Sequence, residues 1–576
     1  MLLIRNQMIN PSYSSYGGQS GVQDYGINGQ IIKNNLIDEW KKFMYEDNIH
    51  LVDLPTTIPQ SVLHTSEHLD KYVDYLTEDD SGKILNAKTV LCEWLKKNNK
   101  TNLLEKINSF GYEELCNYIK IYEILPENNI IVKRTKLVKT NYVGIGEPKI
   151  EYLRPHLAEG VFVNFKGYKD YITKNSKYFK SFGIAQIGKV YRNDTNFSLR
   201  ELTMANIVHF YDPSDRNGIY SYETIELPLL AATKEYILQK ITVTDAFKCG
   251  IFANKAMADS IIKLYYFVCF IGLDKDKIRF RQLFSCEREH YSRNSWHLEC
   301  LVDEKWVHCG ECSDRGSRDL IIHNRTNYVT DISVSRFLPN PLKTTLTSII
   351  PTPNSIRNVN KNVSTKSIRR YFSDMDQNTV SQAVRLLEED LYITISIDNN
   401  MIILKDDSFN IKKIVKNTSE ETFIPMALET SICIDKLLYI ILDQGYKKRE
   451  NIPDAYFLSI SQNLSIYDIA IFSTNNINTN ISIQHSSYAS IKNTLLDFEF
   501  KIYEDVSSKE LNDKYVTCDE IGIKYVITVS ASIQVNTSEE FVLIRDRDTL
   551  TFQYVELSDL VNWLNDKYDM VQKIEK

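Results

Sequence analysis

Three β-rich segments constrain the fold more than any other feature of this sequence. Residues 161–165, 184–192 and 207–211 are dominated by apolar and β-branched side chains. Runs of this length and composition are typical of strands, and we expect them to belong to a mostly antiparallel sheet. Residues 222–240 predict a long helix, which Pro228 is expected to break or kink.

The length and composition are those of a globular protein with several domains. At 576 residues we expect three or four structural units. There is no run of about 18 apolar residues, so no membrane span is expected, and the N-terminus lacks the pattern of a signal peptide. The ten cysteines form no dense framework, which predicts reduced thiols and a cytoplasmic location. A net charge of −7 argues against indiscriminate nucleic-acid binding.

Changes in composition along the chain predict its organisation. Residues 79–125 are rich in Lys, Glu and Leu and predict a helical inserted subdomain. Residues 325–420 contain several prolines and a basic stretch, and predict a second insertion. From about residue 451 onward, β-branched runs alternate with helical ones, as in an α/β domain.

Several long motifs occur in one collinear order. They include LRPHLAEGVFVNF at 153–165, AQIGKVYRND at 185–194 and RELTMANIVHFYDP at 200–213, with further blocks at 16–26, 278–282, 306–320, 428–439, 514–522 and 543–548. Together they resemble the motifs of eukaryotic-type glycyl-tRNA synthetases, which are class II aminoacyl-tRNA synthetases. Long motifs in the right order are far more specific than a lone short match.

The resemblance implies an α+β fold with a class II synthetase core, in which helices flank an antiparallel sheet. This core is expected to span residues 1–450, with insertions at about 79–140 and 325–420. A C-terminal α/β domain similar to anticodon-binding domains is expected at 451–576. The family pattern also implies a homodimer, tRNA (specifically tRNA-Gly) as partner, and no membrane association. ATP with Mg²⁺ is implied as cofactor if the protein is active, and none otherwise.

The resemblance also implies roles for individual residues. Arg192 matches the catalytic arginine that bridges the amino-acid carboxylate and the α-phosphate, where fixed positive charge is needed. The positions that match ATP-binding residues are Arg192, Asp194 and Lys436. The positions that match the glycine site are Glu429, Ser431, Arg315 and Arg154. In the C-terminal domain, the matching charged cluster, with a structural or RNA-binding role, is Asp519, Glu520, Arg545 and Arg547.

The chain departs from the family pattern at the ATP site. Leu202 stands in place of the phenylalanine that stacks on adenine, and Lys436 in place of the motif-three arginine. An ammonium supplies charge but lacks the planar fork and stacking face of a guanidinium. Cys433 and Asp435 replace family glycines, and the loop at 195–199 is about half the usual length. Losing one preorganised charge-stabilising donor alone costs roughly 10²–10³ in rate.

The glycine site departs from the pattern as well. His156 and Val208 replace family glutamates, and His308 stands where an acid is expected. Glu311 is an acid where the family has a glycine. Because it lies three residues after His308, strand alternation predicts that these two side chains point to opposite faces of the sheet.

A metal site is not expected. The pair Cys309-Gly-Glu-Cys312, with Cys300, His297 and His308 nearby, is the pattern most similar to a zinc site. No second cysteine pair follows at the usual spacing.

These departures predict a glycyl-tRNA synthetase-like protein that binds tRNA and in which ATP-dependent glycylation is lost or impaired. One alternative is an active glycine–tRNA ligase, which converts ATP, glycine and tRNA-Gly to glycyl-tRNA, AMP and pyrophosphate. It rests on Arg192, Glu429, Ser431 and Arg315. Another alternative is a synthetase-like accessory subunit of a nucleic-acid polymerase, which needs shape and basic surface but no ATP site.

Overall fold

The computed structural model separates into two compact units. The first comprises residues 1–171, 180–332 and 425–576, and the second comprises 172–179 and 333–424. No described helix is both long and apolar enough to cross a membrane. The structure describes residues 2–575 except 20, 45–47, 79–83, 101–102, 104–106, 108–109, 126–130, 142–149, 193–198, 215–223, 234–236, 253, 286, 328–331, 353–364, 376–378, 381–382, 386–391, 398–399, 406–408, 451, 474–480 and 530–540.

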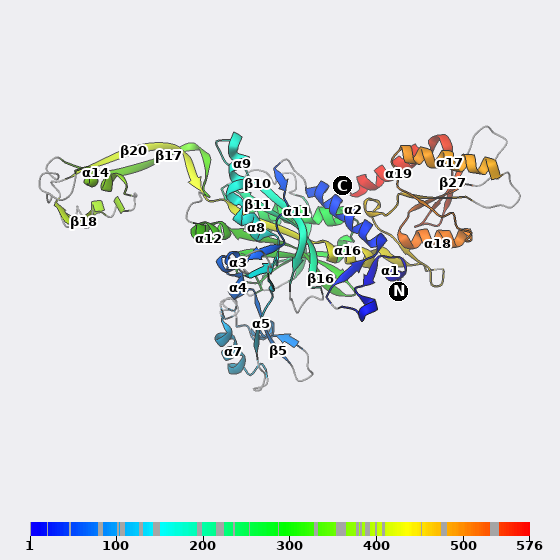
Figure 1. Cartoon of the computed structure of the whole chain (residues 1–576), viewed down its shortest axis with the longest axis horizontal. Coiled ribbons are helices and arrows are strands. Elements are labelled where there is room, and N and C mark those ends of the chain that lie inside the picture. Colours follow the sequence, from blue (N-terminus) through cyan, green and yellow to red (C-terminus); the bar gives the residue numbers. More distant parts are fainter. Residues whose placement is uncertain are drawn as a thin grey trace. The chain divides into compact units, whose positions relative to one another are not determined.

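The largest element of the first unit is a nine-stranded sheet (Figure 1). Its described pairings are antiparallel except those of β12 with β14 and of β10 with β3. The predicted strand at 207–211 lies within β11, and the one at 184–192 belongs to β10 except for its last residue. In spatial order the strands are β13 (Leu238–Thr242), β12 (Glu226–Leu230), β14 (Ile278–Gln282), β15 (Asn294–Val302), β16 (Lys305–Gly316), β21 (Met426–Cys433), β11 (Glu201–Tyr211), β10 (Phe182–Tyr191) and β3 (Ile49–Leu51).

Alternation along the central strands gives the sheet two different faces. On β11, Ala205 belongs to the hydrophobic core, whereas Asn206 lines a cavity on the other side. On β21, Ile432 belongs to the core, whereas Ser431 lines the same cavity. Because successive strand residues point to opposite faces, one face is apolar and the other presents polar groups.

Three helices cover the apolar face and share its core. The longest buries one residue per turn, namely Ile32, Leu36, Trp40 and Met44, at the spacing that places side chains on one helical face. The three helices are α2 (Ile27–Met44), α11 (Lys255–Phe270) and α16 (Ile434–Gly445).

Shorter helices border the polar face, and one of them overturns a prediction. The strand expected at 161–165 is wrong, because these residues end α8 (Ala158–Val163) and begin α9 (Phe165–Ile172). Phe165 packs against Phe182 and Phe210 of the sheet, with ring centroids 6.2 and 4.7 Å apart. Burial against the sheet therefore outweighs the strand propensity of the Val-Phe-Val run. The third helix on this side is α12 (Arg318–Asn327).

The helix predicted for 222–240 is also wrong. The described part of this segment forms β12 and β13, which pair antiparallel with Pro228 opposite Lys240. Proline removes a helical hydrogen bond and clashes with the preceding turn, which favours the extended alternative. Residues 222–223 and 234–236 lie outside the described residues.

Smaller elements complete the N-terminal part of the first unit, including α5 and α7 of the segment expected to be an insertion. Three small sheets have the orders β1–β2, β4–β9–β8 and β6–β5–β7. The elements are α1 (Leu2–Arg5), β1 (Ile9–Pro11), β2 (Gln23–Tyr25), β4 (Thr57–Pro59), α3 (Gln60–Thr65), α4 (His68–Lys71), β5 (Val73–Glu78), β6 (Ile84–Asn86), α5 (Ala87–Lys97), α7 (Tyr112–Ile121), β7 (Val132–Thr135), β8 (Val138–Asn141), β9 (Ile150–Leu153) and α10 (Val243–Lys248).

The C-terminal part of the first unit has a mixed five-stranded sheet of order β25–β24–β26–β27–β28. Its first three strands are parallel and its last three antiparallel. Helices lie between the strands, as predicted for an α/β domain. The elements are β22 (Tyr446–Lys448), β23 (Tyr456–Leu458), β24 (Ile469–Ser473), α17 (Ile481–Asp497), β25 (Ile502–Glu504), α18 (Leu511–Ile521), β26 (Tyr525–Val529), β27 (Phe541–Asp546), β28 (Phe552–Glu556) and α19 (Leu560–Glu575).

The second unit is built on a long two-stranded antiparallel ribbon. A second hairpin and one helix accompany it, and Lys177 forms an ion pair with Glu420 at the ribbon. The elements are β17 (Val334–Pro351), α14 (Thr365–Ser373), β18 (Tyr392–Ile397), β19 (Asn400–Lys405) and β20 (Phe409–Phe423).

Candidate active site

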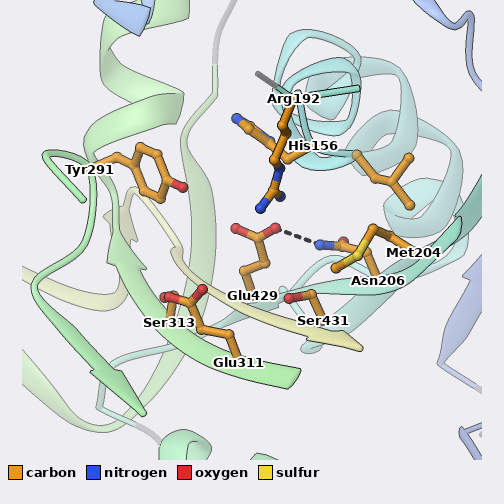
Figure 2. Close-up of a pocket in the computed structure, with 10 residues that line it drawn as sticks. His156, Arg192, Met204, Asn206, Tyr291, Glu311, Ser313, Glu429 and Ser431 are labelled. Carbon is orange, nitrogen blue, oxygen red and sulfur yellow. Dashed lines mark hydrogen bonds between the residues drawn. The ribbon is translucent and has the colours of Figure 1, made fainter. Parts of the chain in front are cut away.

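A small, partly open cavity lies on the polar face of the large sheet (Figure 2). Three adjacent strands, β11, β16 and β21, supply its floor, and the segment before α8 supplies one wall. The lining is mostly polar, with one arginine and two carboxylates. The lining residues are His156, Leu157, Arg192, Met204, Asn206, Tyr291, Glu311, Ser313, Glu429 and Ser431.

Glu429 is the most constrained carboxylate of the cavity. One of its oxygens accepts a hydrogen bond from Asn206, and the other accepts one from Arg315 at 2.7 Å. Arg315 is completely buried, donates to Asp319 at 2.8 Å, and stacks on Tyr291 with its guanidinium carbon 3.8 Å from the ring centre. Burial raises the pKa of Glu429 despite these donors. Glu429 and Arg315, both predicted glycine-site residues, therefore lie together, with Arg315 behind the cavity wall.

Arg192 reaches into the cavity from the side opposite β21. Its Nε donates to the carbonyl of Pro155 at 2.7 Å, and its guanidinium points toward Glu429 in Figure 2. Glu311 lies farther along the floor, where it accepts a hydrogen bond from Ser313. Burial raises the pKa of Glu311, and Arg192 acts in the opposite direction. The predicted residues Arg192, Glu429 and Ser431 thus line one cavity.

A β-bulge overturns the prediction that His308 and Glu311 point to opposite faces. Across β15 and β16, Leu298 pairs with Gly310 and Glu299 pairs with His308, so Cys309 has no ladder partner. A bulge places two residues opposite one and shifts the alternation by one position. The side chains of His308 and Glu311 therefore lie on the same face, where both belong to one cluster with His297. The sequence carried no signal for this bulge.

Lys436 lies in the first turn of α16, directly after β21. Its ammonium is near enough to His308 to help lower the pKa of that imidazole, after burial and His297. The neighbouring Asp435 is turned the other way and is buried. It accepts hydrogen bonds from the backbone N–H of Thr203, from Lys33 at 2.5 Å and from Tyr25 at 2.6 Å. The acid that stands at a family glycine position is thus neutralised by Lys33.

Leu202 does not offer a stacking surface. Its side chain is buried in a small apolar cluster with Leu157, Val190 and Cys433. Leu157 also lines the cavity, so this part of the wall is aliphatic where the resemblance leads one to expect an aromatic ring.

Two other predicted residues stand apart from the cavity. Arg154 is buried, and its guanidinium donates to the carbonyls of Lys189 and Leu54 at 2.7 Å each. It is not among the residues that line the cavity, and its part in glycine binding stays a prediction. Asp194 lies outside the described residues.

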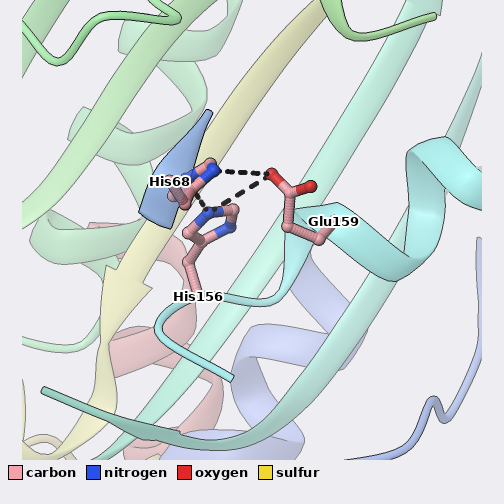
Figure 3. Close-up of side chains that lie close together, drawn as sticks. All are labelled: His68, His156 and Glu159. Carbon is pink, nitrogen blue, oxygen red and sulfur yellow. Dashed lines mark hydrogen bonds and ion pairs between the residues drawn. The ribbon is translucent and has the colours of Figure 1, made fainter. Parts of the chain in front are cut away.

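His156 connects the cavity to a buried histidine cluster (Figure 3). Its Nε2 is 2.9 Å from Nε2 of His68, whose Nδ1 is 2.8 Å from the Ser66 hydroxyl. Glu159, which is fully buried, lies 3.5 Å from His156 and accepts a hydrogen bond from His323. Burial opposes its ionisation, but His68, His323 and His156 together hold the pKa of Glu159 well below its usual range. The sequence did not indicate a role for His68, because this residue lies in no motif.

The four predicted charged residues of the C-terminal domain are buried. Asp519 accepts two hydrogen bonds from Arg545, at 2.7 and 2.9 Å, and a third from Arg449 at 2.7 Å. Glu520 pairs with Arg5, near the N-terminus, and Arg547 donates to the carbonyl of Gly522. The exposed fractions of Asp519, Glu520, Arg545 and Arg547 are 4, 5, 6 and 2%. This geometry supports a structural role for the cluster over direct contact with RNA.

Known proteins resemble this chain over nearly its whole length. Residues 473–567 match the anticodon binding domain family. The chain is 26% identical over 598 residues to the glycine–tRNA ligase of Caenorhabditis elegans, covering 98% of this chain and 78% of that protein. It is 27% identical over 596 residues to glycine–tRNA ligase 2 of Saccharomyces cerevisiae, covering 98 and 94%. For the glycine–tRNA ligase of Methanocaldococcus jannaschii the identity is 26% over 578 residues, covering 96% of both chains.

A solved structure shares the architecture. Prolyl-tRNA synthetase of Giardia lamblia, in complex with prolyl-adenylate, matches with a TM-score of 0.52 at 12% identity, covering 100% of this chain and 79% of that chain. At this low sequence identity, the match shows only that the fold is shared. The predicted fold class, an α+β synthetase core followed by an anticodon-binding domain, is confirmed.

Proposed function

We propose that this chain is a glycyl-tRNA synthetase-like protein that binds tRNA and in which ATP-dependent glycylation is impaired or lost. The observation that supports the impairment is the apolar cluster of Leu202, which meets the cavity through Leu157. An aliphatic side chain buried against Leu157 and Cys433 cannot stack on a base, and stacking is worth about 1–3 kcal/mol per base on nucleic-acid platforms.

The remaining residues fit ATP only in part. Arg192 in the cavity and Lys436 in the first turn of α16 provide positive charge for phosphates, and a helix N-terminus favours anions. Mg²⁺ fits poorly. It prefers about six oxygen ligands in octahedral geometry, but Glu429 is committed to Arg315 and Asn206, and Glu311 has imidazoles beside it.

An active glycine–tRNA ligase is the second candidate, and one observation favours it. Arg192, Glu429 and Ser431 converge on one cavity, together with a second carboxylate, Glu311. A cation for a carboxylate and acids for an ammonium are the groups that an α-amino acid requires.

Retention of tRNA binding is supported by the matched domain at 473–567. Its charged cluster is buried, so RNA contacts are expected from exposed residues of this domain. Phe552 and Tyr554 stand two residues apart on the edge strand β28, with 52 and 61% of their surface exposed. Side chains two apart on a strand share one face, and exposed aromatic faces stack on unpaired bases.

The test measures binding of tRNA-Gly to the full-length chain over a salt series, because affinities for nucleic acids depend on salt. We expect binding that ATP does not change. The double variant Phe552→Ala, Tyr554→Ala should bind about 1–3 kcal/mol more weakly for each stacked base lost. Val516→Ala, at an exposed residue of α18, is the matched control. Binding to primed DNA but not to tRNA would contradict the proposal and favour the polymerase accessory role.

A further inference from the structure

We propose that His297, His308 and Glu311 form a site for a transition-metal ion at the cavity, with Zn²⁺ the ion that their donor atoms suit best. The inference goes beyond the proposed function, since it requires neither ATP nor tRNA. Each residue offers one donor atom, and the three atoms lie within 4.8 Å of one another.

The bulge in β16 builds this arrangement. His297 of β15 and Glu311 of β16 are direct partners across the two strands. Without the bulge at Cys309, His308 would face the hydrophobic core. With it, the two imidazoles stack, their ring centres 3.7 Å apart and their planes 6° from parallel.

The donor set distinguishes among metal ions. Two imidazoles and one carboxylate are a common three-ligand set of open zinc sites, in which the fourth position takes water or another ligand. Imidazole suits Zn²⁺, Cu²⁺, Fe²⁺ and Ni²⁺, whereas Mg²⁺ and Ca²⁺ take oxygen ligands. Of the three residues, Glu311 lines the cavity, so the site borders the cavity through this carboxylate.

The two imidazoles are available as ligands. Neither has a hydrogen-bond partner in the part of the chain that the structure describes, and Nδ1 of His297 is a buried polar atom without one.

Metal binding requires the two imidazoles to leave their parallel stack, because a bound ion lies near the plane of each ring that holds it. Tetrahedral zinc with bonds of about 2.0–2.2 Å holds its donor atoms roughly 3.3–3.5 Å apart. Nε2 of His297 is 4.0 Å from Oε2 of Glu311. Turning one imidazole out of the stack, together with rotation of the half-buried Glu311 side chain, would direct the three donor atoms at one ion.

The charges around the site act in both directions. Lys436 and Arg192 are near enough to act on His308 and oppose a divalent cation. Glu299 and Glu287 act on His297 with the opposite sign. Glu299 already pairs with Arg279 and Arg281, at 2.7 and 2.8 Å. Arg281 also acts on both imidazoles but is paired with Glu299, so removal of Lys436 should tighten metal binding.

The nearby cysteines are not the ligands. Cys300, Cys309 and Cys312 belong to the hydrophobic core on the other face of the sheet. The sulfurs of Cys300 and Cys309 are 3.7 Å apart, and this contact together with burial raises the pKa of Cys309 far above its usual value. Metal binding requires a thiolate, which this environment disfavours.

The test uses the untagged full-length protein, stripped with a chelator and titrated with Zn²⁺ and then Co²⁺. We expect one equivalent of Zn²⁺ per chain. The Co²⁺ form should have visible bands of nitrogen and oxygen ligation without sulfur charge-transfer absorption. In His308→Gln and in the isosteric Glu311→Gln, affinity should fall by more than about 100-fold, because losing only an outer-shell partner costs roughly 10–100-fold. Lys436→Gln should tighten binding.

Matched controls separate this site from other ligands. His64→Gln alters an exposed histidine, Cys309→Ser tests the thiols, and His68→Gln tests the buried cluster. Each should keep the full equivalent of Zn²⁺. The proposal is overturned if the folded wild-type protein binds no stoichiometric Zn²⁺, if the equivalent persists in both His308→Gln and Glu311→Gln, or if Cys309→Ser or His68→Gln abolishes it.

Discussion

Two clusters in this protein contain the same residue types, two histidines and one glutamate, yet their surroundings differ. In the buried cluster (Figure 3), His68, His156 and Glu159 each have at least one protein partner, although Nδ1 of His156 and Oε1 of Glu159 accept no hydrogen bond from the described residues. A fully buried arginine lies 3.7 Å from the glutamate. In the cluster of His297, His308 and Glu311, the side chains are only partly buried and both imidazoles lack hydrogen bonds to the described residues.

The difference shows that composition alone does not make a ligand site. Arg315 occupies the place next to Glu159 where a cation would otherwise compensate the carboxylate. A metal ion there would face that guanidinium in a low-dielectric interior, where repulsion is strong. We therefore assign the buried cluster to stability and the cavity cluster to ligand binding.

The largest expected effect is on the buried cluster. Glu159→Gln should lower the free energy of unfolding by about 3–5 kcal/mol, because removing one partner of a buried ionic network leaves the others uncompensated. Glu311→Gln should change it by less than about 1 kcal/mol in the absence of metal. Chemical denaturation of both variants checks this. Equal losses would mean that the two clusters do not differ in role.

Metal addition should act on the other cluster alone. At a free Zn²⁺ concentration of 100 times Kd, the wild-type protein should gain about 2.7 kcal/mol of stability. His308→Gln should gain nothing, and His68→Gln should gain as much as the wild type. Denaturation curves with Zn²⁺ and with chelator measure this, and stabilisation of His308→Gln would contradict the assignment.

Acidification should lower the stability of the folded protein through its buried histidines. Burial lowers the folded-state pKa of His68 and, more strongly, of His156, whereas the ordinary value is about 6.5. Below pH 6.5 the unfolded chain binds protons that the folded chain does not. The free energy of unfolding therefore decreases as the pH is lowered, until the folded-state pKa is reached. Each histidine contributes about 1.4 kcal/mol per pH unit.

Comparison with a variant isolates this contribution. His68→Gln should reduce the dependence of stability on pH, between pH 6.5 and 5.5, by the equivalent of about one proton. His64→Gln, at an exposed position, should leave the dependence unchanged. An unaltered slope in His68→Gln would mean that this imidazole is not held neutral by burial.

The smallest effect is expected for the imidazole that has no partner. His308→Gln in chelator should change the free energy of unfolding by no more than about 1 kcal/mol, because no hydrogen bond among the described residues is lost. A loss of several kcal/mol would show that His308 has a structural role.

Sequence patterns predicted much of the fold but less of the site. The strands β10 and β11 follow from their apolar runs, and the α/β character of the C-terminal region follows from its alternation. The helical conformation at 161–165 does not follow from the local sequence, because Phe165 is fixed by contacts with Phe182 and Phe210 of distant strands. The strands β12 and β13 contradict the predicted helix, and Pro228 is the local signal that disfavours a helix there.

The cavity itself shows the same limit. Arg192, Glu429 and Ser431 were found by their motifs, and the structure brings them together. The shared face of His308 and Glu311 depends on one unpaired residue, Cys309, and strand alternation alone predicts the opposite. The buried ion pairs of Asp435 with Lys33 and of Asp519 with Arg545 join segments far apart in the chain, which a single sequence does not reveal.

We propose that the cavity retains Arg192 and Glu429 of the family pattern but lacks groups that would hold ATP for glycylation. Glycine-dependent ATP–pyrophosphate exchange tests it most directly, with Arg192→Ala as the background control. We predict that the wild-type chain shows exchange no greater than Arg192→Ala, while the folded protein still binds tRNA-Gly. Any exchange above this background should appear only in the Lys436→Arg variant. Robust glycine-dependent exchange by the wild-type chain would contradict the account and identify an active glycine–tRNA ligase.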